Sequence, residues 1–183
     1  MAFEATIEDS PVIAGVRVVT PSVGRDARGT IWTSVDRHLE ARLLPEGRRF
    51  VHDKFSLSHR HVLRGIHGDH KSWKLVTAVW GEIYQVAADM RPDSPTYLRW
   101  QAWRISAEAP RLVLLPPGVG NAYLVLGEAA VYHYKLCYEG DYADADEQFT
   151  VAWNDPRLGI EWPVAEPVLS ERDRRAGHAD DRA

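Results

Sequence analysis

The stretch KLVTAVWGEIYQVAAD, residues 74–89, holds two runs rich in β-branched, aromatic and other apolar residues on either side of a single glycine. Such residues favour extended strands, and a glycine between two runs is typical of a turn. Gly, Pro, Asp or Asn residues also separate five further runs of this kind, at residues 12–20, 96–105, 111–115, 122–126 and 130–138. Seven short strands with turn signals between them predict an all-β sandwich or barrel.

Two segments depart from this strand pattern. Residues 34–44, SVDRHLEARLL, carry leucines at helical spacing behind Ser34 and Asp36, and either of these two residues can cap a helix. We therefore expect one or two short peripheral helices beside the sheets. Beyond Trp162 the chain is dense in charge and poor in apolar residues, so we expect its tail to fray after about residue 175.

The composition is that of an ordinary globular protein and argues against several kinds of partner. The chain has 183 residues, so we expect residues 1–183 to form one domain. Apolar residues make up 45% of it and charged residues 26%, with a net charge of -4, which favours neither nucleic acid nor a membrane surface. We expect neither a leader nor a membrane span, because MAFEATIEDS has no basic stretch ahead of an apolar core and no apolar run approaches ~18 residues. With Cys137 as the only cysteine, we expect a cytoplasmic protein without disulfides.

Histidines gather in and just before the stretch VLRGIHGDHKSWKLV, residues 62–76. Five of the eight lie within nineteen residues, namely His52, His59, His61, His67 and His70. Neighbouring side chains on a strand point to opposite faces, so only part of this cluster can share a site, and a surface or framework role is the alternative for each. His67 differs because Arg64 precedes it by three residues and Gly65 would allow the backbone to approach a ligand closely. This pattern predicts a base beside an anionic group such as a phosphate.

A metal site is the rival interpretation of the same histidines, because His-x-His and His-x-x-His spacings can bind zinc, iron or manganese. In cupin barrels the usual metal motifs are His-x-His with a glutamate and a later Pro-x-Gly-x-x-His turn. Here the first motif reads His67-Gly68-Asp69, and the later turn, residues 116–121, ends in Asn121. Both further histidines are missing, so we expect no metal. The second hypothesis remains a metal-dependent enzyme that uses His59, His61, His67 or His70.

The run AVYHYKLCY, residues 130–138, carries tyrosines that can reach an interior site. Strand alternation places Tyr132 and Tyr134 on one face and His133 on the other. A packing role with a satisfied hydroxyl is the alternative for each tyrosine. Lys74 opens a strand directly after the histidine-rich stretch, where it is either a solvated edge residue or a cation of the site.

Five segments together resemble a known family: VLRGIH (62–67), KLVTAVWGEIYQVAADMRPDSPTY (74–97), PPGVGNAYLVL (116–126), AVYHYK (130–135) and WNDPRLGIEWP (153–163). In this order, they resemble the dTDP-4-dehydrorhamnose 3,5-epimerase family of cupins. The resemblance implies a jelly-roll sandwich, also called a double-stranded β-helix, and a homodimer that exchanges N-terminal strands, with no metal or organic cofactor. It also implies a nucleoside-diphosphate 4-keto-6-deoxy sugar as substrate, with inversion at C3, C5 or both.

The same resemblance assigns catalytic roles by motif. It implies His67 as the base, Asp173 in LSERD as the carboxylate that orients this base, and Tyr134 as the acid on the opposite face. Lys74 matches the lysine that stabilises the enolate. These roles are chemically coherent, because a ketone acidifies the neighbouring C–H bonds, a nearby cation stabilises the enolate, and imidazole titrates near neutral pH.

A second group of candidate residues concerns the nucleotide part of the substrate. By resemblance, Arg64 and Arg28 match residues that contact the diphosphate and the sugar. Members that use deoxythymidine often have a glutamate after RGFFF and Gln and Asn in FVQDN, where this chain has Thr33, His52 and Lys54. We take these three as candidate substrate-binding residues. We expect a GDP-linked hexose or heptose first, a dTDP sugar next and a CDP sugar after these.

Two departures from the family pattern affect the pocket itself. The family turn His-Gly-Phe reads Asn121-Ala122-Tyr123 here, and an expected aspartate is Gln85. Asn121 and Gln85 are candidate substrate-binding residues, and the loss of an imidazole and a carboxylate changes the charge around the base. These changes suggest the third hypothesis, a non-catalytic module that binds a sugar nucleotide without turnover.

Overall fold

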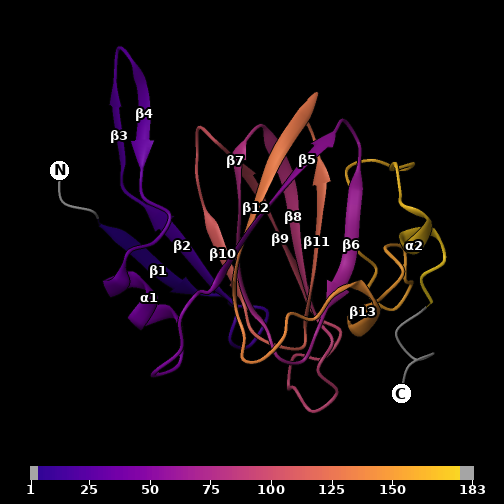
Figure 1. Ribbon diagram of the computed structural model, residues 1–183. Coiled ribbons are helices and arrows are strands. Elements are labelled where there is room, and N and C mark those ends of the chain that lie inside the picture. Colours follow the sequence, from indigo (N-terminus) through magenta and orange to yellow (C-terminus); the bar gives the residue numbers. More distant parts are fainter. Residues whose placement is uncertain (1–3, 178–183) are drawn as a thin grey trace.

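The computed structural model describes residues 4–177, in which two antiparallel sheets face one another and both helices lie at the edges (Figure 1). One sheet has six strands in the order β1 (Ala5–Asp9), β2 (Arg17–Pro21), β10 (Leu112–Leu115), β7 (Trp73–Trp80), β12 (Ala129–Cys137) and β5 (His52–His59). The other has five, in the order β13 (Phe149–Thr150), β6 (Leu63–Gly68), β11 (Val119–Val125), β8 (Glu82–Asp89) and β9 (Trp100–Ser106). The predicted all-β class is confirmed.

A two-stranded hairpin stands away from both sheets, at the upper left of Figure 1. It consists of β3 (Val23–Asp26) and β4 (Gly29–Trp32), which pair in antiparallel register. Side chains on this hairpin lack the cover of a second sheet, and Ile31 is 77% exposed. The hairpin therefore extends away from the packed interior, and Trp32 at the end of β4 packs against a core cluster at its base.

Both helices are short and peripheral. Helix α1 (Arg37–Leu43) follows Asp36, whose side chain accepts a hydrogen bond from the backbone N–H of Leu39 at 2.8 Å, so the predicted helix and one of its two candidate caps are confirmed. The buried leucines of α1 pack against the six-stranded sheet. Helix α2 (Glu171–Arg174) lies beside β6, and the Ser170 hydroxyl caps it by accepting from the Asp173 backbone N–H at 3.2 Å.

The core between the sheets is apolar over most of its length and polar at one end. Its largest fully buried members include Tyr123, Tyr132, Ile83 and Ile105. Polar residues are also buried between the sheets, among them Lys74, Gln85 and Asn121, and each of these three residues is at most 6% exposed as a whole. A buried polar group costs free energy unless it is hydrogen-bonded or paired, so this end of the barrel is the natural place to look for a site.

The sequence pattern predicts two strands that are longer than those in the structure. The runs at 12–20 and 96–105 begin their strands late, at Arg17 and Trp100. The hydroxyls of Ser10 and Ser94 accept backbone N–H groups from residues two or three positions later and close turns there. Side-chain hydrogen bonds of this kind compete with extended pairing.

The described chain ends at Gly177, whose carbonyl accepts a hydrogen bond from the backbone N–H of Ala152 at 2.9 Å. The fraying expected after about residue 175 therefore falls mostly on residues outside the described range. Within residues 4–177, no helix combines the length and the apolar character needed to cross a membrane.

Candidate active site

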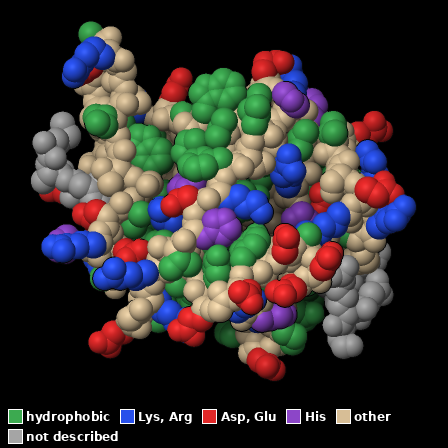
Figure 2. All heavy atoms as spheres, viewed as in Figure 1, with side chains coloured by type: hydrophobic (Ala, Val, Ile, Leu, Met, Phe, Trp, Pro, Cys, Tyr) green, Lys and Arg blue, Asp and Glu red, His purple; other side chains and the backbone are tan. Residues whose placement is uncertain are grey.

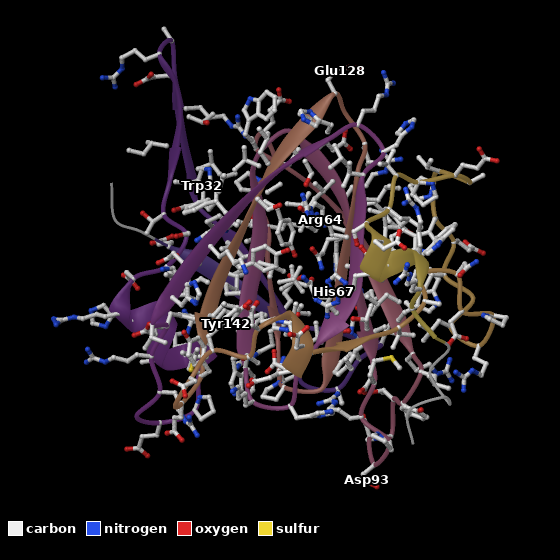
Figure 3. All side chains as sticks on the ribbon, turned by 45° about the vertical axis from the view of Figure 1, so that its right-hand side comes forward. Trp32, Arg64, His67, Asp93, Glu128 and Tyr142 are labelled. Atoms are coloured by element: carbon white, nitrogen blue, oxygen red, sulfur yellow. The ribbon has the colours of Figure 1, made fainter. Side chains whose placement is uncertain are left out.

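A cavity of about 280 Å³ opens between the two sheets beside α2, and most of the candidate residues surround it. Strands of both sheets, the loop before β13 and α2 contribute to its wall. The lining residues are Lys54, Ser56, Arg64, His67, Lys74, Asn121, Tyr134, Leu136, Tyr142, Asp144, Ala145, Gln148, Ser170, Arg172 and Asp173. Figure 3 looks toward this opening, with Arg64 and His67 labelled inside it and Tyr142 at its edge.

His67 on β6 is paired with Asp173 on α2. The His67 Nε2 lies 2.6 Å from the Asp173 Oδ1, and the Ser170 hydroxyl donates to the other carboxylate oxygen at 2.7 Å. Burial is the largest single influence and raises the pKa of Asp173, but His67, Ser170 and Arg172 together hold this pKa below its usual value. An ionised Asp173 accepts Nε2–H, so neutral His67 keeps its lone pair on Nδ1, and the imidazole can act as a base.

Lys74 at the start of β7 is buried against Asp69. The ammonium nitrogen lies 2.9 Å from Asp69 Oδ2, and the two side chains are 8% and 3% exposed. Burial lowers the pKa of Lys74, while the charge of Asp69 opposes this shift and that of Arg172 adds to it. The interpretation of Lys74 as a solvated edge residue is therefore wrong.

Tyr134 on β12 faces the cavity, within a group of stacked tyrosines. Its ring meets that of Tyr132 edge-on at 4.6 Å, and Tyr132 stacks on Tyr123 at 4.0 Å. Burial raises the pKa of Tyr134 well above that of a free tyrosine, so its hydroxyl stays protonated and can donate. His133 points to the other side of β12, where it pairs with Asp53, so the predicted alternation along this strand is confirmed.

Cationic side chains occupy the rim of the cavity. The Arg64 Nε donates to the Ser58 hydroxyl at 2.9 Å, and Lys54 lies over the Tyr142 ring at 5.1 Å. Arg172, which the sequence analysis missed, donates from Nε to the Thr150 hydroxyl at 2.7 Å. Positive groups held by neutral partners keep their charge available, which suits a diphosphate.

Gln85 and Asn121 are hydrogen-bonded to each other. The Gln85 Nε2 donates to the Asn121 Oδ1 at 2.7 Å, and the Tyr132 hydroxyl donates to the Gln85 Oε1 at 2.6 Å. Asn121 lines the cavity, whereas Gln85 is fully buried behind it. The expected role of Gly65 is also revised: a side chain there would meet the Asn121 carbonyl at 2.5 Å, so the close neighbour is β11.

Three candidate residues lie outside the cavity of their own chain. Arg28 sits at the tip of the β3–β4 hairpin, where its side chain is 90% exposed and pairs with Asp26 at 2.5 Å. Thr33 is exposed just beyond β4. His52 contacts the Tyr138 hydroxyl through Nδ1 at 3.2 Å and reaches the cavity only through its ring contact with Tyr142.

The structure offers little support for a metal centre. Among residues 4–177, no three His, Cys, Asp or Glu side chains gather as a possible ligand set. Of the histidines named for the metal hypothesis, His67 alone lines the cavity, and its Nε2 is engaged by Asp173. A transition metal needs several such donors together.

Two facing sheets around a cavity with a histidine–aspartate pair, a buried lysine and a tyrosine define a cupin-fold enzyme equipped for acid–base chemistry. The family model described as dTDP-4-dehydrorhamnose 3,5-epimerase matches residues 11–181, and the chain belongs to this family of isomerases.

Comparisons with individual proteins agree with this assignment. The chain is 37% identical to the dTDP-4-dehydrorhamnose 3,5-epimerase of Pseudomonas aeruginosa, over 89% of this chain and 90% of that protein. It is also 37% identical to the dTDP-4-dehydrorhamnose 3-epimerase of Streptomyces niveus, over 90% of this chain and 79% of the other. A crystal structure of the Legionella pneumophila dTDP-6-deoxy-D-glucose-3,5-epimerase with dTDP-4-keto-L-rhamnose superposes with a TM-score of 0.89 at 33% identity, covering 98% and 95% of the two chains.

Proposed function

We propose that this protein epimerises a nucleoside-diphosphate 4-keto-6-deoxy sugar at C3, C5 or both, through proton transfer without a metal or organic cofactor. The observation that carries the proposal is that the His67–Asp173 pair and the Tyr134 hydroxyl line one cavity. A base and a donor in one cavity are what inversion next to a ketone requires.

The reaction runs through an enolate. Nδ1 of His67 takes the proton from the carbon next to the ketone, and the C–H electron pair forms the C=C bond of an enolate whose oxygen becomes negative. The Lys74 ammonium stabilises this oxygen, and the Tyr134 hydroxyl returns a proton to the opposite face. Exchange with water then restores the imidazole and the phenol.

For the nucleotide we now favour deoxythymidine diphosphate, because the names of all three relatives above carry dTDP. The GDP expectation rests on a resemblance of GIHGD (65–69) and GNA (120–122) to GDP-sugar members and on the changes at Thr33, His52 and Lys54, and of these three Lys54 alone lines the cavity. Thermal-shift measurements with dTDP, GDP, CDP and UDP rank the bases, since a ligand that binds the folded state raises the melting temperature. A larger shift with GDP would reverse the order.

We also propose a homodimer in which the β3–β4 hairpin reaches the partner's cavity. Arg28 and Thr33 do not line the cavity of their own chain. Exposed apolar side chains on the hairpin and on the edge strand β5 offer a contact surface: Ile31, Phe55 and Leu57. Figure 2 shows hydrophobic side chains gathered on this face beside the hairpin.

Subunit mixing tests the dimer proposal. Arg28→Ala and His67→Ala are each expected to be inactive. Random re-association of the two variants should restore about a quarter of wild-type activity, because half of the dimers carry one intact site out of two. If Arg28 serves its own chain, no mixed dimer has an intact site and mixing restores nothing.

Deuterium uptake tests the enzyme itself. In D₂O the wild-type protein should incorporate deuterium at C3, C5 or both of a dTDP-4-keto-6-deoxy sugar, and His67→Ala should abolish this. Tight binding by calorimetry without any exchange would instead support a non-catalytic binding module. Stoichiometric metal in untagged protein would favour a metal enzyme. A cytoplasmic location remains a prediction, which fractionation of the producing cells can check.

A further inference from the structure

Hydrogen bonds fix the orientation of the two buried amides beside the base. The Gln85 Nε2 donates to the backbone carbonyl of Val86 at 3.0 Å, and a carbonyl can only accept. The second Nε2 hydrogen therefore points to the Asn121 Oδ1, and the Gln85 Oε1 accepts from the Tyr132 hydroxyl. Neither amide can be turned around without placing two acceptors or two donors face to face.

These hydrogen bonds leave one donor group of the two amides, the Asn121 Nδ2, for the cavity. The Asn121 Oδ1 accepts from the Gln85 Nε2 at 2.7 Å, and at 3.0 Å it shares the single hydrogen of the Tyr132 hydroxyl with the Gln85 Oε1. Asn121 Nδ2 has no protein partner among residues 4–177, and it is not among the buried groups that lack one. Asn121 is also the register partner of His67 across β11 and β6, and both side chains line the cavity.

We propose that Asn121 Nδ2–H donates a hydrogen bond to an oxygen of the keto sugar next to the carbon that His67 deprotonates, and that Gln85 is the positioning residue that holds this donor in place. The proposal rests on the proposed function and adds a second donor to the Lys74 ammonium. A donor aimed where negative charge develops stabilises the transition state without reorganisation.

The donor differs from a histidine in that it does not titrate. The amides carry no ionisable group, and burial raises the pKa of Tyr132 well above its usual value, so its hydroxyl stays protonated. Across the pH range in which an imidazole changes charge, Asn121 therefore presents the same neutral N–H group.

Asn121→Asp is the direct test, because it keeps the shape and replaces the N–H donor with an acceptor. We expect the rate of deuterium incorporation in saturating dTDP-4-keto-6-deoxy sugar to fall about 10²-fold or more, the usual loss for one such donor. Incorporation within about threefold of the wild-type rate would overturn the proposal while leaving the epimerase function intact.

Gln85→Glu tests the positioning role, because Gln85 does not touch the cavity. The introduced carboxylate, when ionised, repels the Asn121 Oδ1 and turns the amide, whereas the protonated carboxyl group can donate to it again. The activity of Gln85→Glu relative to wild type should therefore rise as pH falls. A loss that is the same at every pH would show a merely structural role and would contradict the proposal.

The matched control is Gln101→Glu on β9. Gln101 accepts from the Ser10 hydroxyl at 2.5 Å, and a glutamate keeps that acceptor. This variant should show no change in pH profile relative to wild type. A similar pH effect in Gln101→Glu would mean that the added charge, and not the position, is responsible.

A binding measurement separates this proposal from the epimerase function. Saturation of ¹⁵N-labelled wild-type protein with dTDP-glucose, which has no ketone and cannot react, should move the Asn121 side-chain amide signals, identified by their absence in Asn121→Asp. Movement of these signals supports the donor role even if no keto sugar incorporates deuterium. Unmoved signals would overturn the proposal whatever the outcome of the deuterium experiment.

Discussion

Two histidine–aspartate pairs with the same 2.6 Å separation lie in different settings of this molecule. His67 and Asp173 face the cavity, and the aspartate side chain is 2% exposed. His133 and Asp53 lie on the outer side of β12 and β5, where the aspartate side chain is 47% exposed and Phe55 stacks on the imidazole at 4.6 Å. The two pairs therefore differ in surroundings and not in hydrogen-bond length, because His67 lines a cavity that can hold a substrate and His133 does not.

The two carboxylates also differ in the partners that lower their pKa. Burial raises the pKa of each, and hydrogen bonds and charges lower both below the usual value. For Asp173 the main lowering partner is His67, whereas for Asp53 it is Lys135, which binds it at 2.9 Å. The inner carboxylate, Asp173, therefore pairs mainly with its histidine, whereas the outer one, Asp53, binds a lysine and a histidine together.

The largest expected effect comes from the same substitution in each pair. Asp173→Asn removes the charge that orients and stabilises His67, so kcat/KM for epimerisation should fall about 10²- to 10⁴-fold. Asp53→Asn should stay within about threefold of wild type, as for most substitutions near the surface. Deuterium incorporation measures both, and equal losses in the two variants would break the comparison.

The second-largest expected effect is on the unfolding free energy, and it compares a lysine beside the cavity with a lysine beside the outer pair. Lys74→Met leaves the Oδ2 of buried Asp69 without its cation and should cost about 3–5 kcal/mol of unfolding free energy. Lys135→Met should cost about 1 kcal/mol or less, because Asp53 is half exposed and keeps His133. Urea denaturation measures both, and adding Asp69→Asn to Lys74→Met should recover part of the loss. No recovery would show that packing, and not the stranded charge, destabilises the variant.

Local patterns in the sequence predicted which side chains share a face of one strand. Alternation along residues 130–138 placed Tyr132 and Tyr134 on one face and His133 on the other, and this arrangement is confirmed. Strand alternation could not identify the partner of His67, because Asp173 is 106 residues away in the sequence. Resemblance to the family was the only indication of Asp173.

Contacts that depend on strand register escaped the sequence analysis. Gln85 and Asn121 were named as separate pocket residues, but their hydrogen bond needs the pairing of β8 with β11, which no local pattern reports. Arg172 was overlooked although it precedes Asp173, because a charged residue near a chain end usually indicates a solvated surface. Its position in the LSERD motif was the available signal.

The smallest expected effect is on the pH dependence of stability, and it also separates the two pairs. Asp173 has a folded-state pKa below its unfolded value of about 3.9, so its contribution is present above that pH and is lost as pH falls through the folded pKa. Asp173→Asn should therefore flatten the fall in unfolding free energy on acidification below about pH 4. Asp53→Asn should flatten it less, because solvent screens a half-exposed carboxylate. Urea titrations at several acidic pH values give the slopes, and a flatter curve for Asp53→Asn than for Asp173→Asn would show that the outer pair is the more strongly coupled one.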